Sequence, residues 1–173
     1  MEPKTLIVYP EKCNNCKDCE TACIESRSTL TSSGLSCIRI MREQISKVES
    51  DDDFFFPVAC KQCDKPPCLA VCPKEAIYQD KETDRVLIDR QKCVGCGMCV
   101  TSCPFGAMKI DKKRGKSYKC DLCAGDPQCV KVCEPQALEY LDFEMLKYPN
   151  MYNAANKLAW VKQPSLKESL GRD

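Results

Sequence analysis

The stretch CVGCGMCVTSCP, residues 93–104, decides how this chain is interpreted. Three cysteines follow one another at steps of three, a fourth comes four residues later, and proline follows it directly. This spacing is typical of cysteines that bind [4Fe–4S] clusters. The physical reason is compactness, because two steps of three let a tight loop wrap around three corners of a cube-shaped cluster. Gly95 and Gly97 would then relieve crowding where the backbone approaches that cluster.

The same pattern occurs four times, which makes it an internal repeat of a small structural unit. Every group opens with a step of three and closes with a step of four, and the middle step is three, five, three and six residues in turn. The longer middle steps carry turn residues at 64–67 and 124–128. The groups are, in chain order, Cys13, Cys16, Cys19 and Cys23; Cys60, Cys63, Cys68 and Cys72; Cys93, Cys96, Cys99 and Cys103; and Cys120, Cys123, Cys129 and Cys133. Alanine stands four positions past the closing cysteine in the last three groups, and Arg27 takes that place in the first.

Disulfides and zinc are the alternatives to iron for a chain with 17 cysteines among 173 residues. The N-terminus shows no secretory signal, so nothing points to the oxidising compartment that disulfides need. Zinc ribbons pair two C-x₂-C elements that are about ten or more residues apart. Here each such pair meets a third cysteine within six residues, which favours iron over zinc.

The overall charge excludes several classes of function. Lys and Arg number 26 against 25 Asp and Glu, so the chain lacks the basic excess of a nucleic-acid-binding protein. Four oxidised clusters at about −2 each would make the loaded protein acidic. The sequence contains no histidine, which excludes imidazole catalysis and histidine-ligated metal sites. No apolar run reaches 18 residues, so no membrane-spanning helix is predicted.

On these four motifs, residues 5–142 resemble the four-cluster ferredoxin-type electron-transfer subunits of molybdenum and tungsten oxidoreductases, hydrogenases and formate dehydrogenases. The resemblance implies four clusters, each ligated by three cysteines of one group and the closing cysteine of a paired group. The implied ligand sets are Cys13, Cys16, Cys19 and Cys133; Cys120, Cys123, Cys129 and Cys23; Cys60, Cys63, Cys68 and Cys103; and Cys93, Cys96, Cys99 and Cys72.

The fold implied by this resemblance is α+β, with two ferredoxin-like lobes. Residues 1–47 and 115–142 would form an outer lobe from groups one and four, and residues 48–114 an inner lobe from groups two and three. Residues 143–173 contain no cysteine, and their apolar residues recur at helical spacing. We expect a C-terminal helical tail there, which either packs on its own lobe or docks on a larger partner.

Local signals predict short strands at 6–9 and 37–45, and hairpins that join 77–78 to 85–88 and 108–110 to 117–118. Brief helices are expected to begin at the closing cysteines, with Pro104 in the first helical turn. The acidic stretch 49–53 and the basic run 112–119 are interpreted as solvated segments; the alternative for each is a docking patch. Cys37, outside the four groups, is expected to be a small buried apolar side chain rather than a ligand.

The function indicated by the resemblance is electron transfer without a catalytic site of its own. The sequence shows no phosphate-binding loop, no dinucleotide motif and no nucleophile–base pair. An enzyme acting at a site-differentiated cluster is the alternative, but it would need a group of only three cysteines. The expected partners are a larger molybdenum or tungsten subunit, with a tungsten-dependent aldehyde oxidoreductase as the nearest match, and a further redox subunit, ferredoxin or flavoprotein. Subunits of a hydrogenase or formate dehydrogenase, or a stand-alone polyferredoxin, are the alternatives. A cytoplasmic heteromeric complex is expected.

Overall fold

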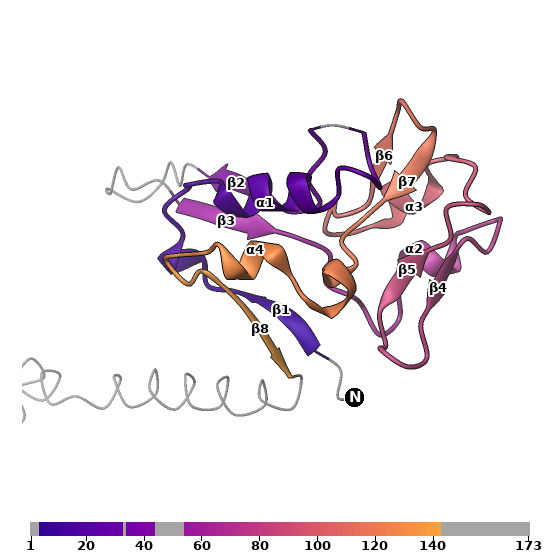
Figure 1. Ribbon diagram of the computed structural model, residues 1–173. Coiled ribbons are helices and arrows are strands. Elements are labelled where there is room, and N and C mark those ends of the chain that lie inside the picture. Colours follow the sequence, from indigo (N-terminus) through magenta and orange to yellow (C-terminus); the bar gives the residue numbers. More distant parts are fainter. Residues whose placement is uncertain (1–3, 33, 44–53, 143–173) are drawn as a thin grey trace, which may run out of the picture.

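Short strands and short helices make up the computed structural model, which describes residues 4–32, 34–43 and 54–142 (Figure 1). The strands form four antiparallel pairs: β1 (Lys4–Val8) with β8 (Leu138–Asp142), β2 (Arg39–Glu43) with β3 (Phe54–Val58), β4 (Ile77–Gln79) with β5 (Val86–Ile88), and β6 (Lys109–Asp111) with β7 (Lys116–Tyr118). The helices are α1 (Asp18–Ser26), α2 (Pro67–Ala70), α3 (Met98–Ser102) and α4 (Gln128–Lys131), with 3₁₀ turns η1 (Pro10–Lys12) and η2 (Leu122–Gly125). This mixed content agrees with the expected α+β class.

Both predicted hairpins are confirmed, and side chains fix their turns. In the β4–β5 turn the carboxylate of Asp80 accepts the backbone N–H of Thr83 at 3.2 Å. In the β6–β7 turn the carboxylate of Asp111 accepts the backbone N–H groups of Lys113 and Arg114 at 3.1 and 3.2 Å. Aspartate caps turns in this way because its short side chain mimics a backbone acceptor.

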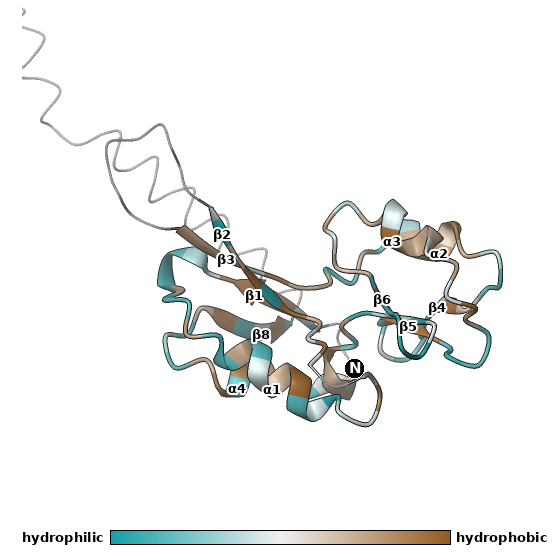
Figure 2. Cartoon of the chain, turned by 90° about the horizontal axis from the view of Figure 1, so that it is seen from above, coloured by the Kyte–Doolittle hydropathy of each residue, from teal (hydrophilic) through white to brown (hydrophobic). Residues whose placement is uncertain are grey.

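Two further strand pairings lie outside the predicted hairpins. The strand expected at 6–9 is found as β1, and it pairs with β8, which is 130 or more residues away, in the register Val8 to Leu138. The strand expected at 37–45 is found as β2, although residues 44 and 45 lie outside the described part of the chain. Its partner β3 was not expected. Phe54, Phe55 and Phe56 make β3 apolar along most of its length, as the brown ribbon of Figure 2 shows.

The predicted helix starts were wrong. Every one of these helices begins before the third cysteine of its group. The helices α2, α3 and α4 end one or two residues before the fourth cysteine, whereas Cys23 lies inside α1, so none of them begins at a closing cysteine. Cys103 shows the reason, because Pro104 follows it and disfavours helical geometry in the preceding residue. Cys103 accordingly has an extended backbone, with φ −78° and ψ 112°. Pro104 therefore terminates α3 and does not lie in the first turn of a helix.

A tight turn after the closing cysteine recurs in the last three groups. The third residue beyond it has a positive φ, and its N–H donates to the carbonyl of that cysteine. The alanine of the repeat comes next and is buried each time. In the first group Arg27 takes that place and is also buried, and its guanidinium pairs with Asp121 at 2.5 Å. Arg27, the residue that departs from the repeat, thus links group one to group four through an ion pair.

The buried apolar side chains form two separate clusters. One gathers residues from β1, α1, β7, α4 and β8, and the other from α2, α3, the β4–β5 hairpin and Met108. In Figure 2, α1 and α4 accordingly lie together at one end and α2 and α3 at the other. Ala59, which follows β3, belongs to the first cluster although its residue number falls within 48–114. The expected tail at 143–173 and the acidic stretch at 49–53 lie outside the described residues.

Gly95→Ala is expected to destabilise the protein far more than Gly106→Ala. Both glycines have a positive φ, 69° and 60°, so each alanine costs about 1–2 kcal/mol of backbone strain. A Cβ at Gly95 would also lie 2.8 Å from the carbonyl carbon of Gly115, whereas nothing lies within 4 Å of one at Gly106. We expect an additional loss of about 1–3 kcal/mol for Gly95→Ala.

Thermal unfolding of the two variants under anaerobic conditions measures this difference. Equal midpoints would contradict the close approach of the 93–97 loop to the β6–β7 turn.

Candidate iron–sulfur sites

The loop around Cys96 has a backbone shape suited to an anionic group. Gly95 and Gly97, on either side of that cysteine, have φ values of 69° and 83°. Left-handed residues alternating with ordinary ones turn successive N–H groups toward one point, a concavity found at many iron–sulfur sites. The sequence analysis anticipated a close backbone approach at both glycines.

The same shape recurs where the sequence has no glycine. Asn15 and Lys17, which flank Cys16, have φ values of 61° and 68°. In group four the left-handed residues are consecutive rather than alternating: Leu122, Cys123 and Ala124 have φ values of 59°, 48° and 58°. These conformations are costly for residues with a Cβ and persist only where the surroundings enforce them. Sequence reasoning missed them, although aligning the groups on their second cysteines would have placed Asn15 and Lys17 at the positions of Gly95 and Gly97.

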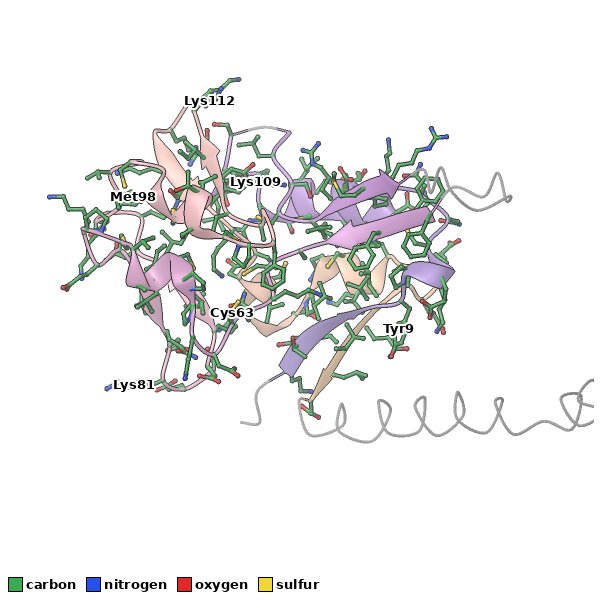
Figure 3. The ribbon with its side chains drawn as sticks, turned by 180° about the vertical axis from the view of Figure 1, so that it is seen from behind. Tyr9, Cys63, Lys81, Met98, Lys109 and Lys112 are labelled. Carbon is green, nitrogen blue, oxygen red and sulfur yellow. The ribbon has the colours of Figure 1, made fainter. Side chains whose placement is uncertain are left out.

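Three hollows are each lined by four grouped cysteines. We name them the 23/120, 60/103 and 72/93 hollows. Their cysteines are Cys23, Cys120, Cys123 and Cys129; Cys60, Cys63, Cys68 and Cys103; and Cys72, Cys93, Cys96 and Cys99, respectively. Each hollow thus takes three cysteines from one group and one closing cysteine from another. Figure 3 shows Cys63 in the interior, while Lys81 and Lys112 stand at loop tips.

The remaining four grouped cysteines are Cys13, Cys16, Cys19 and Cys133, and electrostatic interactions relate three of them. Burial and the nearby charges of Cys16 and Cys133 raise the pKa of Cys19 to about 12, so these three thiols are neighbours. Cys13 stands three residues before Cys16 in the same loop, directly after η1. Packing of α1 against α4 brings the two groups side by side.

The donor set fits iron–sulfur clusters. Cysteine sulfur is the usual ligand of such clusters, and hydrogen bonds to the sulfurs help set their reduction potential. In the 23/120 hollow, Cys23 Sγ accepts the N–H of Cys37 at 3.3 Å and Cys120 Sγ that of Leu122 at 3.4 Å. In the 72/93 hollow, Cys72 Sγ accepts the N–H of Ala76 at 3.3 Å. Cys93 Sγ likewise accepts the N–H of Ser117 at 3.4 Å.

No three Cys, Asp or Glu side chains of the described residues are arranged to hold a single metal ion. The cysteines surround hollows rather than one point. Residues 52–142, which hold groups two, three and four, match the family model of the 4Fe-4S dicluster domain. The chain belongs to the 4Fe-4S dicluster domain family. Group one precedes the matched region.

Relatives of this chain support the same assignment along most of its length. An uncharacterised ferredoxin of Methanocaldococcus jannaschii is 33% identical over 96% of this chain and 90% of its own. The polyferredoxin-like subunit of the Pyrococcus furiosus aliphatic sulfonate oxidoreductase is 30% identical over 88% and 84%. The thiosulfate reductase electron transfer subunit of Salmonella typhi is 32% identical over 78% and 74%. The chain is therefore homologous to iron–sulfur subunits of oxidoreductases. No helix in its described residues is long and apolar enough to cross a membrane.

Burial makes several of the grouped thiols weaker acids in the absence of iron. It raises the pKa of Cys120 to about 12 and that of Cys68 to about 11, aided in both by the charge of Cys60. Cys23 is an exception, because its hydrogen bonds with Cys37 lower its pKa to about 5. Ligation requires thiolates, so loading the chain with iron must displace protons from the buried thiols.

Two lysines of the basic run do not lie in a solvated turn as expected. Lys119 is only 3% exposed, and its ammonium donates to the carbonyl of Cys120 at 2.7 Å. The half-buried Lys116 donates to the carbonyl of Cys93 at 2.5 Å. Lys112, Lys113 and Arg114 are exposed, as the sequence indicated. The run therefore divides into a solvated tip and two lysines that hold the opening cysteines of groups three and four.

Cys37 is confirmed as a buried side chain, at 2% exposure, and it lies beside the ligands of the 23/120 hollow. We expect Cys37→Ala to leave the iron content unchanged, because the donor to Cys23 Sγ is the backbone N–H, which alanine retains. The lost sulfur should cost about 1–2 kcal/mol of folding stability. Iron per chain and the spectrum of the reduced protein in electron paramagnetic resonance check this. Loss of about four irons would identify Cys37 as a ligand.

Proposed function

We propose that this chain is an electron-transfer subunit that carries four [4Fe–4S] clusters and connects a catalytic oxidoreductase subunit to a second redox partner. One observation carries the proposal: three separate hollows are each lined by four cysteines, drawn from two groups in the combination expected of a cluster ligand set. When bound, such clusters supply one-electron oxidation and reduction.

Three of the proposed ligand sets are the cysteines that line the three hollows, and the fourth set is assigned by the same combination of groups. Each set takes three cysteines of one group and the closing cysteine of its partner group. The sets are Cys13, Cys16, Cys19 and Cys133; Cys23, Cys120, Cys123 and Cys129; Cys60, Cys63, Cys68 and Cys103; and Cys72, Cys93, Cys96 and Cys99. The protein holds these sulfurs in fixed positions, shields most of them from water and directs backbone N–H groups at several of them.

The exposure of the cysteines supports an order of the sets along the molecule. Cys16 and Cys96 are exposed, and they belong to the first and last of the sets above. Cys60 and Cys120 belong to the two middle sets, and the charge of Cys60 raises the pKa of Cys120. We therefore place the sets of Cys16 and Cys96 at the two ends, where partner proteins reach them, and the other two between.

The proposed organisation is two ferredoxin-like lobes, residues 1–47 with 115–142 and residues 48–114, and a C-terminal tail at 143–173 that docks on the partner. The proposed partner is a molybdenum or tungsten oxidoreductase in the cytoplasm, with a tungsten-dependent aldehyde oxidoreductase as the specific case. Relatives named as subunits of an aliphatic sulfonate oxidoreductase and a thiosulfate reductase support a large catalytic subunit in general.

Anaerobic isolation of the native complex through an affinity tag on this chain tests the proposal. The large subunit that co-elutes in fixed ratio should contain molybdenum or tungsten. Without this chain, that subunit should keep its turnover with an artificial dye and lose its turnover with the physiological acceptor. Equal turnover with the acceptor in the presence and absence of this chain would overturn the proposal.

A further inference from the structure

A cavity next to the cysteine-lined hollows lies where the β4–β5 hairpin meets residues 117–121 and the end of α1, and Arg27 lines both this cavity and the 23/120 hollow. It has a volume of about 230 Å³ and is lined by apolar and aromatic side chains, Ser117 and four charged side chains. The charged residues are Arg27, Arg90, Lys119 and Asp121. Because Asp121 is the one acidic residue among the described residues of the lining, three cations face a single carboxylate.

Two arginine donors at this cavity lack a partner. Arg27 is only 7% exposed, and although its Nη1 pairs with Asp121, its Nε has no hydrogen-bond acceptor. Arg90 Nη2 is also buried and without an acceptor. Leaving a buried guanidinium N–H unpaired costs free energy, because the group has lost its hydration and gained nothing in return. Both residues line the same cavity, so one ligand could satisfy both.

Lys119 adds a third cation to the lining. It is 3% exposed, and its ammonium donates to the carbonyl of Cys120 and, at 3.4 Å, to Gln62 Oε1. An ammonium has three N–H donors, so one of them is not used by these two contacts. Asp121 is already shared between Arg27 and the N–H of Cys123 at 3.0 Å. The excess positive charge therefore lies with Arg90 and Lys119.

We propose that this cavity binds a tetrahedral oxyanion of the phosphate or sulfate type. Arginine N–H groups form short, strong hydrogen bonds with phosphate and carboxylate oxygens. A tetrahedral anion presents oxygens in several directions and can accept from Arg27, Arg90 and Lys119 at once. A planar carboxylate presents its oxygens in one plane and fits donors that approach from several directions less well. The proposal does not depend on electron transfer, although Arg27 also lines the 23/120 hollow.

Calorimetric titration of the anaerobically purified full-length protein with inorganic phosphate and with sulfate, at constant ionic strength in chloride, tests this site. We expect one site per chain with a Kd of about 1 mM or tighter. Arg90→Gln should weaken binding roughly tenfold or more, because it removes a charged donor. Lys81→Gln removes the same charge at the tip of the β4–β5 turn (Figure 3) and should change binding less than about twofold.

A second variant and a second anion keep the test decisive. Arg27→Lys retains the charge and removes the guanidinium fork, and it should also weaken binding roughly tenfold. If Arg27→Lys lowers the iron content, the effect of Arg90→Gln on anion affinity alone decides whether the site exists. Acetate should bind roughly tenfold more weakly than phosphate, since its two coplanar oxygens cannot approach all three donors in good geometry. No saturation by phosphate or sulfate, equal weakening by Arg90→Gln and Lys81→Gln, or acetate binding as tight as phosphate would overturn the proposal.

Discussion

Removal of iron is expected to unfold the described part of the chain rather than leave an empty scaffold. The two apolar clusters are small, and cysteines make up four of ten buried residues in one and two of five in the other. Emptied hollows next to these clusters would lose the contacts that hold the surrounding loops. Domains of this size are stable by only about 5–15 kcal/mol, so the loss of several bound groups exceeds what the remaining core supplies.

Chelation of iron under anaerobic conditions, followed by circular dichroism and limited proteolysis, measures this effect. We expect loss of the cooperative thermal transition and cleavage throughout residues 4–142. The matched control uses the same chelator already saturated with iron, which should leave both readouts unchanged. An iron-free chain that keeps its protease resistance would contradict the account.

Cys103→Ser is expected to alter the cluster that we assign to Cys60, Cys63 and Cys68, and not the one assigned to its own group. Cys103 lies at the end of α3 and lines the 60/103 hollow, whereas Cys93, Cys96 and Cys99 line the 72/93 hollow. A serine oxygen is a poorer ligand for iron than a thiolate. The variant should therefore lose about one to four irons per chain. Its reduced spectrum in electron paramagnetic resonance should match that of Cys68→Ser and differ from that of Cys99→Ser.

The same variant should separate two kinds of turnover in the complex. Turnover with a dye that reacts at the partner's own active site should survive. Turnover with the physiological acceptor should fall roughly tenfold or more, which corresponds to an activation free energy higher by at least about 1.4 kcal/mol. Cys37→Ser is the control, because it makes the same chemical change beside the 23/120 hollow at a residue we do not assign as a ligand. Equal loss of both activities in Cys103→Ser would mean that the clusters do not act in series.

Short-range features were predictable from the sequence because their causes are local. Turn residues between apolar pairs predicted both hairpins, and β4–β5 and β6–β7 are where they were expected. The repeat also predicted shared structure, and the buried alanines and the turns before them recur accordingly. The closing cysteines were expected at helix starts because proline fits the first turn of a helix, but Pro104 instead follows the end of α3.

The features that sequence reasoning missed depend on contacts between distant segments. Nothing near Phe54 indicates that β3 will pair with β2, or near Leu138 that β8 will pair with β1. The left-handed backbone at Leu122 and Ala124 opposes the preference of those residues, so only the surrounding structure determines it. Arg27 was visible as a break in the repeat, but its partner Asp121 lies 94 positions away.

Iron and acid-labile sulfide in the anaerobically purified protein test the central claim most directly. Four cysteine sets predict about sixteen iron and sixteen sulfide per chain. About eight of each would contradict the assignment of four clusters, and stoichiometric zinc with little sulfide would contradict the iron–sulfur account altogether.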